Sequence, residues 1–123
     1  MGMDSYLFVA HSKKELQSPD FWKNVSNFEI TEELPRNPIG EWWYARKFYS
    51  AHEYVQQNLL HGEYECGDFV PMSYEMVDRL LQYCCKHRDY FGGFNTITAL
   101  CELLDHWGEL EARGLKVFYE CDW

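Results

Sequence analysis

The sequence predicts a small α+β domain, with three main helices packed on a short antiparallel sheet that includes the N- and C-terminal strands. Three observations predict it: an apolar, β-type run near the N-terminus, helical apolar patterns in the middle, and an alternating run at the C-terminus. A length of 123 residues fits one domain, spanning 1–123, and 46% hydrophobic residues supply a core.

Both ends of the chain are predicted to be strands. Residues 5–11 are rich in aromatic and branched side chains, and residues 115–121 alternate between apolar and polar ones. Gly114 is expected to end the helix that precedes the last strand. We expect the two terminal strands to be neighbours in the sheet.

A short helix is predicted to begin at Ser18, because a capping hydroxyl is followed by proline and then an acid. Residues 27–40 contain two prolines and end in Gly40, which predicts a loop. A brief extended piece is expected over residues 28–30.

The clearest helical pattern covers residues 41–59, with one apolar stripe expected to face the core. The stripe consists of Tyr44, Phe48, Ala51, Val55 and Leu59. On the opposite side, Arg46 pairing with nearby acids such as Glu53 is the simplest interpretation of a solvated surface.

Two further helices are predicted, one from Ser73 and one from near Asn95, separated by a glycine-rich turn. Gly108 is expected to weaken the second of them. The predicted buried residues of the first are Met76, Val77, Leu80, Leu81 and Cys84. Those of the second are Ile97, Leu100, Cys101, Leu104 and Trp107.

The net charge of −9, from 11 basic and 20 acidic residues, argues against a nucleic-acid binder and favours a basic partner. No lysine or arginine lies between Lys47 and Arg79 or between Arg88 and Arg113, although both segments carry acids and aromatic rings. Such a surface can mimic DNA toward a basic protein, although an acidic surface that only aids solubility has the same composition. The residues predicted for the interface are Glu63, Tyr64, Glu65, Asp68, Phe69, Glu102, Asp105 and Glu109.

A second hypothesis is a pocket for a small anionic, nucleotide-like ligand between the 41–59 helix and the terminal strands. Cations supply forked hydrogen bonds and aromatic rings supply a stacking surface for such a ligand. The residues predicted to line it are Tyr6, Arg46, Lys47, Tyr49, His52 and Trp123.

Catalytic and metal-binding motifs are missing from the sequence. No nucleophile elbow, P-loop or zinc-protease motif occurs, and the best acid–base candidate is His52 with Asp4 or Asp122. We therefore expect a protein that is not an enzyme and has no cofactor. The potential metal ligands lack a Cys-x₂-Cys spacing, so no metal is expected, and Cys84 and Cys101 fit core positions. These potential ligands are Cys84, Cys85, His87, Cys101, His106 and Cys121.

An odd number of cysteines, five, favours a reduced, cytoplasmic protein. The N-terminus lacks the basic segment of a signal peptide, and no apolar stretch is long enough for a membrane span. Trp22, Trp42 and Trp43 are too bulky for all three to be buried in a domain of this size, which favours a homodimer.

Four segments along the chain carry a recognisable pattern. They read Gly2-Met3-Asp4-Ser5-Tyr6-Leu7, then Tyr44-Ala45-Arg46-Lys47-Phe48-Tyr49-Ser50-Ala51-His52, then Met72-Ser73-Tyr74-Glu75, and finally Phe118-Tyr119-Glu120-Cys121-Asp122-Trp123. In this order they resemble a family of small phage- or prophage-encoded proteins of uncharacterised function. That family has a Gly-Leu-Asp-Met-Tyr-Leu start, a Tyr-Trp-Arg-Lys helix with a following His, and a Tyr-Tyr-Gln-Ser-Ser-Trp end.

The chain departs from the family pattern in three places. Ala45 replaces a tryptophan, Tyr49 replaces an asparagine, and a long insert before the last helix is shortened to residues 91–94. If the family's insert closes over a ligand, that site is lost or changed here. The resemblance implies a phage or prophage origin. Small accessory phage proteins without catalytic motifs commonly act by binding, and the acidic charge distribution favours one that binds and inhibits a host defence protein. The anionic-ligand pocket is the alternative.

Overall fold

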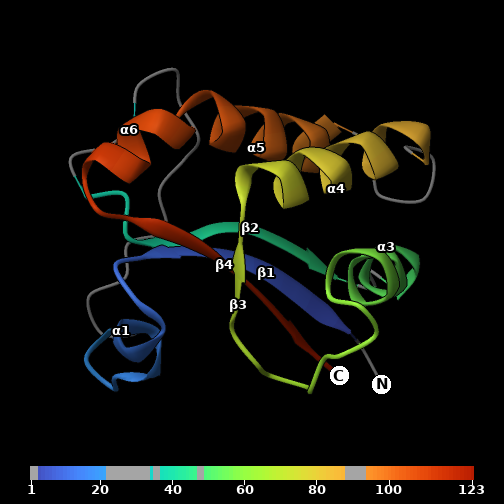
Figure 1. Cartoon of the computed structure of the whole chain (residues 1–123), viewed down its shortest axis with the longest axis horizontal. Helices are drawn as coiled ribbons and strands as arrows, with labels where there is room; N and C mark the ends of the chain where they lie inside the picture. The colour runs from blue at the N-terminus through green and yellow to red at the C-terminus, as the bar shows by residue number, and fades with distance from the viewer. Residues whose placement is uncertain (1–2, 22–33, 35–36, 47–48, 88–93) are drawn as a thin grey trace.

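The structure, a computed structural model, describes residues 3–21, 34, 37–46, 49–87 and 94–123 (Figure 1). In these residues a four-stranded sheet is built from β1 (Asp4–Ala10), β2 (Gly40–Arg46), β3 (Val70–Met72) and β4 (Lys116–Asp122), in the order β2-β1-β4-β3. Each neighbouring pair is antiparallel, and the two terminal strands lie side by side as predicted.

Helices cover the sheet on both sides. The described helices are α1 (Lys13–Gln17), α3 (Tyr49–Tyr54), the π-helix η1 (Val55–Leu59), α4 (Tyr74–Lys86), α5 (Phe94–Asp105) and α6 (Trp107–Ala112). Figure 1 shows α4, α5 and α6 on one side of the sheet and α1 on the other. The predicted α+β class is therefore confirmed. No helix in the described ranges is long and apolar enough to cross a membrane.

The prediction of a single helix over residues 41–59 is wrong in its first part. Residues Gly40–Arg46 form β2, because their aromatic run suits a strand and pairs with β1. Tyr44, expected in the buried stripe, is consequently 42% exposed. The helical part begins only at Tyr49, where Ala51, Val55 and Leu59 do face the core.

The N-terminal helix also lies elsewhere than expected. The hydroxyl of Ser12 caps α1 by accepting a hydrogen bond from the Glu15 N–H, whereas Ser18 ends this helix. The helix predicted to follow Ser18, and the extended piece over residues 28–30, lie largely outside the described residues.

A β-bulge in β2 explains how two consecutive tryptophans are buried together. Trp43 pairs with Leu7 but Phe8 pairs with Glu41, which leaves Trp42 as the extra residue. Both tryptophans belong to the same core cluster, and each is 5% exposed. Two of the three tryptophans are thus buried within one chain, whereas Trp22 lies outside the described residues, so the expectation that all three cannot be buried, and with it the homodimer, stays a prediction.

The two tryptophans also set which face of α5 is buried. The Trp42 indole donates to the Ala99 carbonyl at 2.9 Å, and the Trp43 indole donates to the Thr96 hydroxyl at 3.3 Å. The buried face is therefore Thr96, Ala99, Leu100 and Leu103, whereas Cys101, predicted as core, is exposed.

The remaining helices follow their sequence signals closely. Ser73 caps α4, and its buried residues are Val77, Leu80, Leu81 and Cys84, with Met76 partly buried. The break between α5 and α6 falls at His106, before Gly108. Gly114 has a φ of +73° and follows the last turn of α6, as predicted.

Candidate functional site

The sheet has two faces of different character. The α5 face carries Leu7, Val9 and Tyr119, which pack in the main core. The α1 face carries the alternate residues, among them Phe8 and Phe118, which form a second and smaller core with Leu16 of α1. Because side chains alternate along a strand, Tyr6 and Glu120 also lie on the α1 face.

Carboxylates gather on the α1 face where β1 and β4 pair. Asp4 is opposite Asp122, and Tyr6 is opposite Glu120. Asp4 accepts a hydrogen bond of 2.8 Å from the Tyr44 hydroxyl of β2. Glu41, opposite Phe8, adds a further carboxylate from β2.

Aromatic rings form a row beside these acids. Tyr6 stacks on Phe8 with ring centroids 5.3 Å apart, and its other neighbour is Tyr44, at 5.0 Å. Phe69, from the loop before β3, meets Phe8 edge to face at 5.9 Å. Acids and rings therefore occupy the same face, a combination suited to cations.

A cavity of about 370 Å³ lies among these groups, and we call it the acidic groove. Its lining residues are Tyr6, Phe8, Glu41, Phe69, Glu120 and Asp122. No lysine or arginine is among the described residues that line it.

Glu120 has the most strongly perturbed carboxyl of the groove. The residue is only 5% exposed, and this burial is the main cause that raises its pKa to about 8. A hydrogen bond with Asp122 and the negative charges of Asp122 and Asp4 raise the pKa further. Burial likewise raises the pKa of Glu41. Burial, together with the charges of Asp4 and its neighbours, raises the pKa of Tyr6 to about 12. Burial and the neighbouring acids therefore disfavour the ionised forms of these groups.

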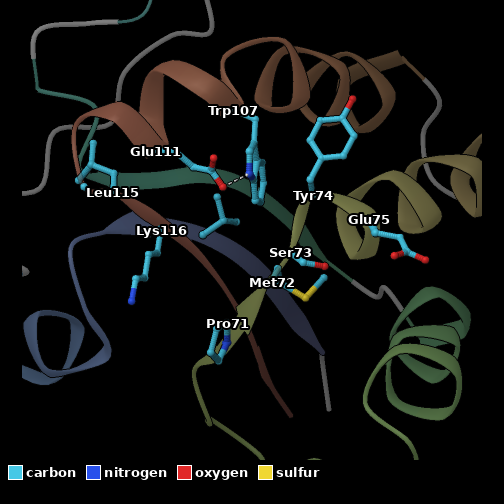
Figure 2. Close-up of a pocket in the computed structure, with 11 residues that line it drawn as sticks. Pro71, Met72, Ser73, Tyr74, Glu75, Trp107, Glu111, Leu115 and Lys116 are labelled. Carbon is cyan, nitrogen blue, oxygen red and sulfur yellow. Dashed lines mark hydrogen bonds between the residues drawn. The ribbon is translucent and has the colours of Figure 1, made fainter.

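A larger hollow of about 680 Å³ lies where β3 leads into α4 (Figure 2). Tyr74 and Trp107 meet edge to face across it at 5.8 Å, and the Trp107 indole donates to Glu111 at 3.2 Å. Lys116 and Glu75 also line it, so both signs of charge are present. This mixture does not favour one class of ligand.

His52 belongs to a buried polar cluster on the α5 face. Its Nδ1 is 2.7 Å from the Tyr119 hydroxyl, which is also 3.3 Å from the Ser5 hydroxyl. Its Nε2 is buried without a hydrogen-bond partner, and burial lowers the pKa of the ring. The acid–base pairing of His52 with Asp4 or Asp122 is not observed, because Tyr119 bonds Nδ1 and strand alternation places both acids on the opposite face of the sheet.

The residues predicted for the anionic-ligand pocket are only partly brought together. His52 and Trp123 lie near each other, with ring centroids 5.5 Å apart. Tyr6 is on the α1 face, so the sheet separates it from His52. Arg46 ends β2 and Tyr49 begins α3. The side chains of these two residues, and the whole of Lys47, lie outside the described residues.

The predicted acidic interface divides into two separate segments, one in the loop before β3 and one across α5 and α6, which lie far apart in Figure 1. In the loop, Glu63 and Glu65 are exposed. Tyr64 serves the fold, because its hydroxyl donates to the Asp68 carbonyl at 2.8 Å and accepts from the Cys121 N–H at 2.6 Å.

The remaining predicted interface residues have local partners. Lys13 of α1 pairs with the Asp68 carboxylate at 2.9 Å, and Phe69 lines the acidic groove. Glu109 pairs with Arg113. The exposed Asp105 and the partly buried Glu102 belong to α5, near His106.

Metal coordination finds no support in the described part of the chain, where no group of three or more His, Cys, Asp or Glu side chains is arranged to hold an ion. Of the cysteines considered as ligands, Cys84 and Cys121 are buried and Cys101 is exposed. Comparison with family models, with curated proteins and with solved structures finds no match.

Sequence reasoning did not assign Glu41 and Glu120 to any site, and it considered Asp4 and Asp122 only as partners of His52. A signal was present at the C-terminus, where acids at positions 120 and 122 alternate with Tyr119 and Cys121. In a terminal strand this alternation places both acids on one face. The proximity of these two acids to Glu41 of β2 could not be predicted, because residues 41–59 were interpreted as a helix.

Proposed function

We propose that this chain is a non-catalytic, phage-type accessory protein that binds a basic host protein, acting in the host cytoplasm as an inhibitor of a defence protein. The observation that supports this most is the acidic groove, where three carboxylates of β2 and β4, with Asp4 of β1 beside them, lie along a row of aromatic rings. The net charge of −9 adds long-range attraction for a basic partner.

The aromatic rings distinguish this surface from one that only aids solubility. Acids that only keep a protein soluble do not need aromatic side chains next to them, whereas the centres of protein–protein interfaces are rich in aromatic side chains. Tyr44, which donates to Asp4, is 42% exposed beside the groove. The alternative, an anionic ligand near His52, finds less support because Tyr6 lies on the opposite face.

Affinity capture from bacterial lysate tests the proposal, using the full chain as bait at low and high salt. The groove variant is Glu120→Gln with Asp122→Asn. The matched control is Glu63→Gln with Glu65→Gln, which neutralises two exposed acids of the interface predicted from sequence. We expect a basic protein that wild type and control retain, that the groove variant loses, and that salt releases. Wild type should also inhibit the activity of that protein.

Two results would contradict the proposal. One is equal capture by the wild type and the groove variant, which would place binding elsewhere. The other is the absence of any specifically captured basic protein. Loss of capture in the control alone would return the interface to the loop before β3.

A further inference from the structure

The acidic groove carries a carboxyl group that the described part of the fold leaves without a cation. Glu120 is 5% exposed and lines the cavity, and within the described residues the hydrogen bonding that affects its carboxyl comes from the carboxyl of Asp122. Two acids share a hydrogen bond only when one of them holds a proton. Burying a carboxylate without a counter-charge is strongly unfavourable. The arrangement is therefore satisfied either by a proton or by a cation from outside.

The geometry of the groove selects among cations. A divalent metal is not favoured, because the described acids do not form a group of three or more able to hold one. An organic cation fits better, since Tyr6, Phe8 and Phe69 supply flat or edge-on rings along the cavity. A guanidinium group stacks on such rings while its N–H groups bond neighbouring carboxyl oxygens. An ammonium group is compact and lacks this planar fork.

The size of the cavity leaves room for one extended side chain. Its volume of about 370 Å³ is at the lower end of the range for small-molecule sites, roughly 300–1,000 Å³. Asp4 and Tyr44 stand beside it, joined by a hydrogen bond, so its rim is itself acidic and polar. An extended partner segment can insert one side chain while its backbone stays at the rim.

We infer that the acidic groove receives one arginine side chain of the protein partner, with the guanidinium between the Glu120 and Asp122 carboxylates and the rings of Tyr6 and Phe69. This inference rests on the proposed function and specifies the chemistry that the partner must present. The guanidinium arrives already charged, so the Glu120 carboxylic acid releases its proton to solvent as the ion pair forms. The hydrogen bond between the Glu120 and Asp122 carboxyls is lost with that proton and replaced by hydrogen bonds from the guanidinium, and no other covalent bond is broken.

Proton release gives the inference a measurable signature. Because burial and Asp122 raise the pKa of Glu120 to about 8, binding near pH 6 must displace a proton, whereas binding above pH 8 need not. Affinity for a guanidinium should therefore rise between pH 6 and pH 8, by up to about tenfold per pH unit for one proton. A purely surface attraction to already ionised acids would show no such rise.

The experiment is an NMR titration of the whole ¹⁵N-labelled chain with three blocked tripeptides, Gly-Arg-Gly, Gly-Lys-Gly and Gly-citrulline-Gly. Citrulline has nearly the shape of arginine but is neutral. We expect the arginine peptide to shift signals of Tyr6, Phe69 and Glu120 with the pH dependence above. The lysine peptide should bind several-fold more weakly, and the citrulline peptide should not bind.

Variants distinguish binding in the acidic groove from attraction to the negative charge of the whole protein. Glu120→Gln should weaken arginine binding at pH 8 at least several-fold and abolish its rise with pH, whereas Glu53→Gln, an exposed acid on α3, should change neither. Asp122→Asn is the second variant should Glu120→Gln fail to fold. Equal shifts from the arginine and citrulline peptides, or shifts confined to residues outside the groove, would overturn the inference.

The outcome is distinguishable from failure of the proposed function. Capture of a basic protein through the groove, without binding of the arginine peptide, would overturn only the arginine assignment. Binding of the arginine peptide with no captured partner would instead contradict the proposed function.

Discussion

The two faces of the sheet differ in how their polar groups are satisfied. On the α5 face, the indoles of Trp42 and Trp43 donate to α5, and Tyr119 bonds both His52 and Ser5. On the α1 face, the carboxyl of Glu120 meets another acid. One face is therefore built chiefly for stability, whereas the other keeps charges together at a cost to stability.

Such a cost is typical of binding sites. Groups selected for function are often held in environments that would be more stable without them. A neutral side chain at position 120 would suit the isolated fold better than a glutamate whose pKa is raised to about 8. The comparison of the two faces thus leads to tests in which stability and binding change in different directions.

The largest expected contrast comes from neighbouring residues of β1. Leu7 is fully buried on the α5 face, so Leu7→Ala should lower the free energy of unfolding by about 2–5 kcal/mol. Tyr6→Leu removes only a partly buried, stacked ring and should cost about 0.5–1.5 kcal/mol, but it should weaken partner capture strongly. Urea unfolding and the capture assay measure both. Equal losses of stability would contradict the proposed division between faces.

A smaller effect is expected from one hydroxyl of the α5 face. Tyr119→Phe leaves the buried Nδ1 of His52 without its partner and should cost about 1–3 kcal/mol. The control is Tyr44→Phe, which removes an exposed hydroxyl of the α1 face and should cost less than about 1 kcal/mol. Thermal unfolding of both variants checks the order, and a larger loss for Tyr44→Phe would reverse it.

The two faces should also respond oppositely to pH. Burial lowers the pKa of His52 from 6.5, so the unfolded chain takes up a proton that the folded chain refuses, and stability falls as the pH drops below about 6.5. Glu120 has its pKa raised from 4.5 to about 8, so its contribution to stability falls as the pH rises from about 4.5 to 8.

Each slope should approach, at most, about 1.4 kcal/mol per pH unit. Difference curves of unfolding free energy between pH 5 and pH 9, wild type against His52→Gln and against Glu120→Gln, isolate the two contributions. Two difference curves with the same sign of slope would contradict the assignment.

The smallest effect is expected at an exposed ion pair. Lys13 and Asp68 tie α1 to the loop before β3 at 2.9 Å, but both side chains are over 40% exposed. Lys13→Met should therefore change the free energy of unfolding by less than about 1 kcal/mol. A loss above about 2 kcal/mol would show that the placement of α1 depends on this pair.

The sequence predicts the fold class and the terminal strands because their signals are local. The capping of α4 by Ser73 depends only on neighbouring residues, and so does the alternation over residues 115–121 that predicts a strand. The signal failed at residues 41–46, where aromatic residues fit a helical stripe and a bulged strand equally well. Pairing with β1 makes residues 41–46 a strand rather than a helix. Such pairing joins segments that are distant in sequence, so no local pattern indicates it.

The acidic and aromatic composition of the candidate site could be predicted from the sequence, but its position could not. An acidic charge and abundant aromatic residues predicted a surface for a basic partner. The acids that gather most closely come from β1, β2 and β4, far apart in sequence. The acid-rich segment around Glu63 looked more prominent because its charges are adjacent in the chain, yet its aromatic residue Tyr64 is occupied in anchoring β4.

The most direct test of the account is the difference in unfolding free energy between Glu120→Gln and the wild type, measured by urea titration at pH 5.5 and pH 9. The account predicts that the variant is more stable than the wild type at pH 9, where the wild type must bury an ionised carboxylate, and that this difference is clearly smaller at pH 5.5, where folded Glu120 is still protonated. A variant less stable than the wild type at both pH values would show that Glu120 serves the fold, and would contradict the claim that the acidic groove is kept for a cationic partner.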